Sequence, residues 1–98
     1  MIIAEFPEVY TVQGGTFEEL LRQHMLRSRG WLPMDDVEKA LDEMVFLLTH
    51  FGGYNVTLAA AGPVEDRARR LFLAMDRLGV VNLSRDDGEP VDAEVVEA

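Results

Sequence analysis

A glycine-rich turn, Gly14-Gly15-Thr16, leads from an apolar alternating segment into the start of a predicted helix. Free backbone amides and the helix dipole attract anions at such a place, so the turn could hold a phosphate. Two acids, Glu18 and Glu19, follow in the first helical turn and would repel one. No complete P-loop or dinucleotide-binding fingerprint accompanies the turn. We therefore expect Thr16 to open a capping box rather than a phosphate site.

The residues that most often bind metals or transfer protons are sparse. His24 and His50 lie on different predicted helices, and neither has a ligand partner four residues further on. The chain has no cysteine, which excludes thiolate nucleophiles, disulfides and cysteine-ligated zinc. Asp35 and Asp36 are adjacent at a helix start, where they are better suited to capping the helix than to acting as a pair in acid–base catalysis. The sequence predicts no catalytic residue, no metal site and no cofactor.

Three arginines, Arg67, Arg69 and Arg70, form a basic cluster. Acids stand one helical turn before Arg69 and Arg70, so the cluster is expected on a salt-bridged, solvent-facing surface. The segment from Arg69 to Val81 resembles the recognition helix and wing of a winged-helix domain, which would imply a DNA-binding regulator. A net charge of −9 and acids at every predicted helix start oppose this alternative. We expect no specific nucleic-acid binding, which a gel shift at low salt would test.

The spacing of apolar residues predicts the elements that carry these side chains. A strand is expected over 2–12, edge-located or kinked because Pro7 lies inside it. Three helices are expected, each with a capping residue or proline at its start and glycine at its end: 16–30, 35–53 and 63–79. Further strands are expected over 54–60 and 80–83. The predicted fold is a small two-layer α/β domain (α+β is the alternative), ordered β-α-α-β-α-β, with a C-terminal parallel βαβ unit.

The acidic charge is concentrated at the end of the chain. Residues 1–85 are predicted to form one globular domain, and residues 86–98, with six acids and no base, a flexible tail. The first residues lack the basic and long apolar regions of a signal peptide, and no apolar run exceeds five residues. These features predict a cytoplasmic domain without a membrane partner.

Two predicted helices are apolar nearly all round, over 44–48 and 71–75. Because packing on a small sheet needs only one apolar stripe, the excess predicts an interface, most simply in a homodimer. The expected function is a non-enzymatic protein–protein interaction or regulatory domain whose partner the sequence does not identify. A small ligand-binding or enzymatic α/β domain is the alternative, ahead of the winged-helix reading. The interface candidates are Trp31, Met44, Phe46, Leu47 and Leu73.

Overall fold

A computed structural model of the chain describes residues 1–28, 36–58 and 62–85. It begins with a hairpin of two antiparallel strands, β1 (Ile2–Phe6) and β2 (Tyr10–Gly14). The predicted single strand over 2–12 is therefore two strands, and Pro7 lies in the turn between them. The Val9 N–H donates to the Phe6 carbonyl across this turn (3.0 Å), and Glu8 has a positive φ of 65°. The sequence pattern did not reveal this turn, because a three-residue loop keeps the even-numbered residues of both strands on the same face of the sheet.

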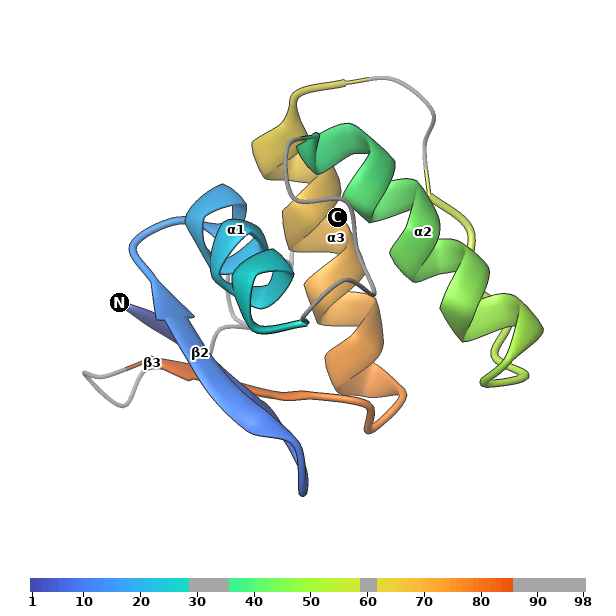
Figure 1. Cartoon of the computed structure of the whole chain (residues 1–98), viewed down its shortest axis with the longest axis horizontal. Helices are drawn as coiled ribbons and strands as arrows, with labels where there is room; N and C mark the ends of the chain where they lie inside the picture. Colours follow the sequence, from blue (N-terminus) through green and yellow to red (C-terminus); the bar gives the residue numbers. More distant parts are fainter. Residues whose placement is uncertain (29–35, 59–61, 86–98) are drawn as a thin grey trace.

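The sheet is completed by β3 (Asn82–Arg85), which pairs antiparallel with β1 in the order β2-β1-β3. The mixed α/β class is confirmed. The parallel C-terminal unit is not, because both strand pairings in the described residues are antiparallel. One sheet face is covered by helices in Figure 1. The other carries mostly polar residues in solvent, which suits an antiparallel sheet.

Three helices lie where the sequence predicts them: α1 (Phe17–Arg27), α2 (Val37–His50) and α3 (Val64–Arg77). Their predicted start signals are confirmed, with Thr16, Asp36 and Pro63 as N-caps. α1 and α3 pack together on the sheet, whereas α2 packs on α3 and α1 and lies further from the strands (Figure 1). α3 ends in a Schellman motif, in which the N–H of Val80 donates to the Met75 carbonyl.

The segment 54–58, predicted to be a strand, is described without regular secondary structure. Its alternation is genuine, since Val56 is buried, Tyr54 and Leu58 are half-buried, and the residues between them are exposed. The N–H of Tyr54 donates to the Leu48 carbonyl, which turns the segment back onto α2 instead of into the sheet. Period-two alternation thus reports a half-buried extended chain here, and not a strand ladder.

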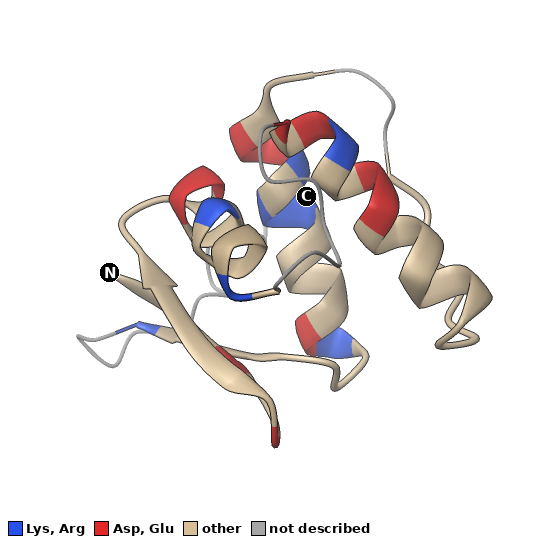
Figure 2. Ribbon diagram, in the orientation of Figure 1, with Lys and Arg blue, Asp and Glu red and all other residues tan. Residues whose placement is uncertain are grey.

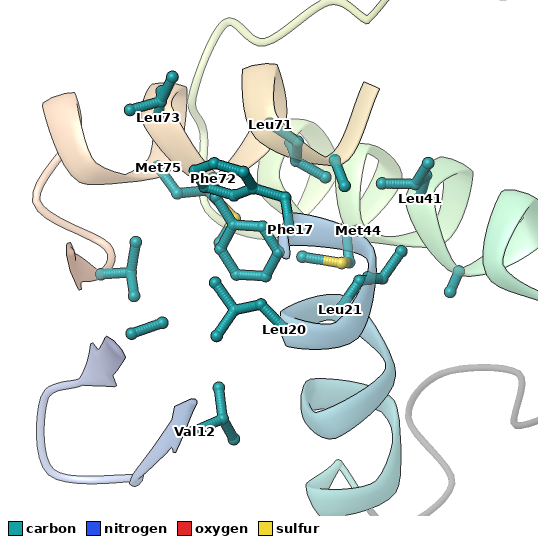
Figure 3. Close-up of a cluster of buried hydrophobic side chains, with 14 of the residues drawn as sticks. Val12, Phe17, Leu20, Leu21, Leu41, Met44, Leu71, Phe72, Leu73 and Met75 are labelled. Carbon is teal, nitrogen blue, oxygen red and sulfur yellow. The ribbon is translucent and has the colours of Figure 1, made fainter. Parts of the chain in front are cut away.

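The core lies between the sheet and the helices, and Figure 3 shows Phe17, Leu20 and Phe72 meeting at its centre. Phe72 and Leu20 are fully buried, and the rings of Phe17 and Phe72 lie 6.4 Å apart. The acidic segment 86–98, expected to be flexible, lies outside the described residues. No helix in the described part of the chain is long and apolar enough to cross a membrane.

Candidate functional site

An open cavity of about 530 Å³ lies at the end of the domain where the hairpin turn, the end of α1 and the second half of α2 meet. We call it the hairpin groove. Its volume falls within the usual range of small-molecule sites. Most of its wall is apolar, supplied by the hairpin, α2 and the end of α3: Phe6, Val9, Met44, Leu47, Leu48, Met75 and Val80. The polar groups of the described wall come from β2 and the end of α1: Tyr10, His24, Arg27 and Ser28.

His24 is the most perturbed titratable group that the structure describes. Its Nδ1 lies 2.7 Å from the Tyr10 hydroxyl, and its ring stacks on Phe6 at a centroid distance of 4.5 Å. Burial among these rings lowers the pKa of His24 to about 4, because the charged imidazolium loses its hydration. The imidazole is therefore neutral at pH 7. It serves as a hydrogen-bonding wall of the groove and does not supply positive charge there.

Arg27 brings the formal charge to the groove. Its guanidinium carbon lies 5.4 Å from the centre of the Tyr10 ring, within cation–π distance. Burial raises the pKa of the Tyr10 phenol, and the nearby positive charge of Arg27 partly opposes this. Within residues 1–28, 36–58 and 62–85, no carboxylate forms an ion pair with Arg27. The described wall of the groove therefore holds one cation and no acid.

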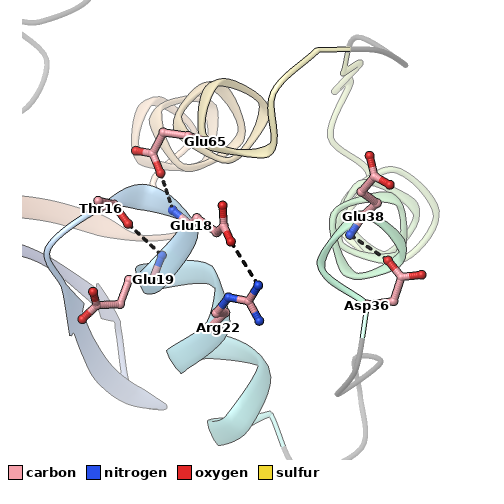
Figure 4. A network of polar contacts seen from close by, with 7 residues as sticks. All are labelled: Thr16, Glu18, Glu19, Arg22, Asp36, Glu38 and Glu65. Carbon is pink, nitrogen blue, oxygen red and sulfur yellow. Dashed lines mark hydrogen bonds and ion pairs between the residues drawn. The ribbon is translucent and has the colours of Figure 1, made fainter.

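The backbone amides that follow the glycine-rich turn before α1 do bind an anion, which is a carboxylate of the protein itself. Glu65 in the first turn of α3 accepts hydrogen bonds from the N–H groups of Phe17 (2.9 Å) and Glu18 (2.7 Å). The Glu19 N–H donates to the Thr16 hydroxyl, which is one half of the predicted capping box (3.1 Å; Figure 4). The other half, a bond from the Thr16 N–H to the Glu19 carboxylate, is not among the hydrogen bonds of the described residues. The amides that could have bound a phosphate are thus already paired, and the expectation of a capping role is supported.

The basic cluster is divided between two environments. Arg67 has a side chain only 6% exposed, and its guanidinium lies 3.4 Å from Asp42 and 3.7 Å from Glu38 on α2. The expectation of a solvent-facing position is therefore wrong for Arg67, because α3 packs between α1 and α2 and buries this side of the helix. Arg69 is partly exposed and pairs with Asp66, and Arg70 is exposed.

The structure separates the five interface candidates. Met44 and Leu73 are buried in the domain's own core, so neither offers surface to a partner. Leu47 is half-buried and lines the hairpin groove. Phe46 is 43% exposed on the outer side of α2. Trp31 lies outside the described residues.

Phe46 belongs to a small aromatic patch that the sequence analysis overlooked. His50 stacks on it at a centroid distance of 4.2 Å, and Phe51, 78% exposed, meets it edge-on at 6.1 Å. Every Asp, Glu, Lys and Arg of α2 lies in its first half, so the helix has none of these residues from Met44 onward, as Figure 2 shows. The i, i+4 spacing of Phe46 and His50 is the sequence signal from which this patch could have been predicted.

The groove itself was also missed, since Tyr10, His24 and Arg27 come from a hairpin and a helix whose packing is not visible in the sequence. The described residues contain no cluster of three or more potential metal ligands. The chain matches no family model, no curated protein and no solved structure. Its function is accordingly argued from the geometry of the groove and of the aromatic patch.

Proposed function

We propose that this chain is a non-enzymatic protein–protein interaction domain that forms a homodimer through the second half of α2. The observation that carries the proposal is the aromatic patch of Phe46, His50 and Phe51, on and just after a stretch of helix without Asp, Glu, Lys or Arg. Exposed aromatic residues of this kind are enriched in protein interfaces. A two-fold axis would place the patch of one copy against the same patch of the other.

The charge distribution favours this surface over the rest of the domain. Asp, Glu, Lys and Arg residues gather near the helix starts in the upper part of Figure 2, whereas the second half of α2 has none of them. Two copies can therefore approach through this helix without bringing like charges together, despite a net charge of −9. The proposal keeps the cytoplasmic location expected from the sequence.

The test is the oligomeric state, measured by light scattering coupled to size exclusion at tens of micromolar protein. We expect a mass of twice the 11.0 kDa of the chain. Phe46→Glu places a charge in the patch and should return the chain to the monomeric mass while its circular dichroism spectrum is unchanged. Leu26→Glu is the matched control, because Leu26 is exposed to a similar extent on α1, away from the patch. A monomeric wild type would contradict the proposal.

A second candidate function, small-ligand binding, is favoured by the hairpin groove. Its volume, its apolar wall and its few polar groups are typical of ligand sites. The Tyr10–His24 pair is suited to positioning a ligand through hydrogen bonds. DNA binding gains no such support, because Arg67 is engaged with acids of α2 and two acids occupy the first turn of α3.

A further inference from the structure

We propose that the hairpin groove binds a small apolar carboxylic acid, with the carboxylate paired to Arg27 and the hydrocarbon part against α2. This inference is independent of the homodimer, since neither Phe46 nor His50 lines the groove. It is carried by the arrangement of one charged group, Arg27, in a described wall that is mostly apolar.

Charge complementarity selects an anion. Arg27 is the charged residue of the described groove wall, and no described carboxylate pairs with it. Other arginines of the domain do have such partners: Arg22 pairs with Glu18 at 3.0 Å, and Arg67 with two acids of α2. A guanidinium binds a carboxylate through charge-assisted, often bidentate hydrogen bonds.

The remaining wall selects an apolar body for that anion. Leu47 and Leu48 from α2 and Phe6 and Val9 from the hairpin line the groove, together with the buried side chains of Met44 and Met75. Methionine side chains adapt to irregular apolar shapes. A phosphate ester or sugar acid would leave this wall without a complementary surface, whereas a hydrocarbon chain would remove it from water.

The position of Arg27 is set by its neighbours on the chain and on the hairpin. It lies in the last turn of α1, and the Tyr10 ring supports its guanidinium from one side. The Tyr10 hydroxyl is held in turn by His24, which stacks on Phe6. The cation is therefore held at the groove by an aromatic support and can meet a carboxylate without first leaving another acid.

The experiment compares three ligands of equal chain length, decanoate, decanol and decylamine, by titration calorimetry at pH 7. We expect decanoate to bind the wild-type chain at least tenfold more tightly than decanol, and decylamine to bind most weakly. Arg27→Gln should bring decanoate to the affinity of decanol, while leaving decanol itself unchanged. Arg22→Gln, on the same helix but outside the groove, is the matched control and should keep the preference for the acid.

Amide chemical shifts locate the ligand in the same samples. Decanoate should shift the resonances of Val9, Leu47 and Val80, which line three sides of the groove. Phe46→Glu should bind decanoate as the wild type does. Equal affinity for acid and alcohol, or shifts confined to residues outside the groove, would overturn the proposal.

Discussion

The domain is expected to lose about 3 kcal/mol of stability as the pH falls from about 6.5 to about 4, through His24 alone. In the unfolded chain this histidine takes up a proton near its ordinary pKa of 6.5, but burial lowers its pKa in the fold to about 4. Between these values the unfolded state binds more protons than the folded one. Stability therefore falls as the pH falls, and above pH 6.5 this contribution is constant.

The groups around the imidazole make the effect specific to this position. The Tyr10 hydroxyl contacts Nδ1, Phe6 covers one face of the ring, and Phe72 approaches it edge-on at 6.4 Å. Protonation must therefore take place in an apolar surrounding or be accompanied by opening of the hairpin.

Urea unfolding at pH 7 and at pH 5 measures the effect, of which about 2 kcal/mol is expected by pH 5. His24→Gln should be less stable than the wild type at pH 7 but should lose markedly less stability on acidification, because its side chain does not titrate. His50→Gln is the matched control, since His50 is exposed at the end of α2. Parallel pH profiles for the wild type and His24→Gln would falsify this account.

Glu65→Gln is expected to destabilise the fold by about 2 kcal/mol, although it changes one oxygen to an amide nitrogen. The two carboxylate oxygens of Glu65 accept separately from the Phe17 and Glu18 N–H groups. Glutamine keeps one acceptor and turns an NH2 group toward the other amide, so one donor faces another. The variant also loses the charge that complements the positive end of the α1 dipole.

Thermal and urea unfolding measure this change, and hydrogen exchange locates it at the start of α1. Glu19→Gln likewise removes one carboxylate charge, here from the first turn of α1 itself, where the Glu19 side chain is exposed and makes no cap, and should cost less than about 0.5 kcal/mol. The amides of Phe17 and Glu18 should lose protection in Glu65→Gln and keep it in Glu19→Gln. Equal stability of the two variants would show that the Glu65 carboxylate is not what completes α1.

Local signals predicted the helices well, because the residues that start and stop them act within a few positions of their own place. Thr16 and Asp36 cap as expected, and Gly79 supplies the positive φ of 80° that ends α3. The strands were predicted less well, since pairing depends on distant partners. Residues 54–58 alternate like a strand, but none of the described strands pairs with them.

The candidate site was the least predictable part. The groove brings together Tyr10, His24 and Arg27 with the second half of α2. That these residues line one cavity follows from tertiary packing and is not visible in the sequence. Glu65 was correctly expected at the start of its own helix. Its carboxylate, however, caps α1, where it accepts from the N–H of Phe17, 48 positions earlier in the chain. Apolar excess on α2 was visible as the run over 44–48. Which of its members face the core, the groove or solvent depended on the position of α3.

The place of β1 at the centre of the sheet has a consequence for synthesis on the ribosome. Its partner on one side, β2, follows after a short turn, whereas the pairing on the other side joins Ile2 to Arg85. A nascent chain can therefore form the hairpin early but carries an open β1 edge until β3 has emerged. An exposed strand edge can form hydrogen bonds with a strand of another chain. Nascent chains on ribosomes that translate the same message in close succession can therefore pair with one another. Chaperone occupancy of this protein should accordingly be highest while residues 15–81 are being made.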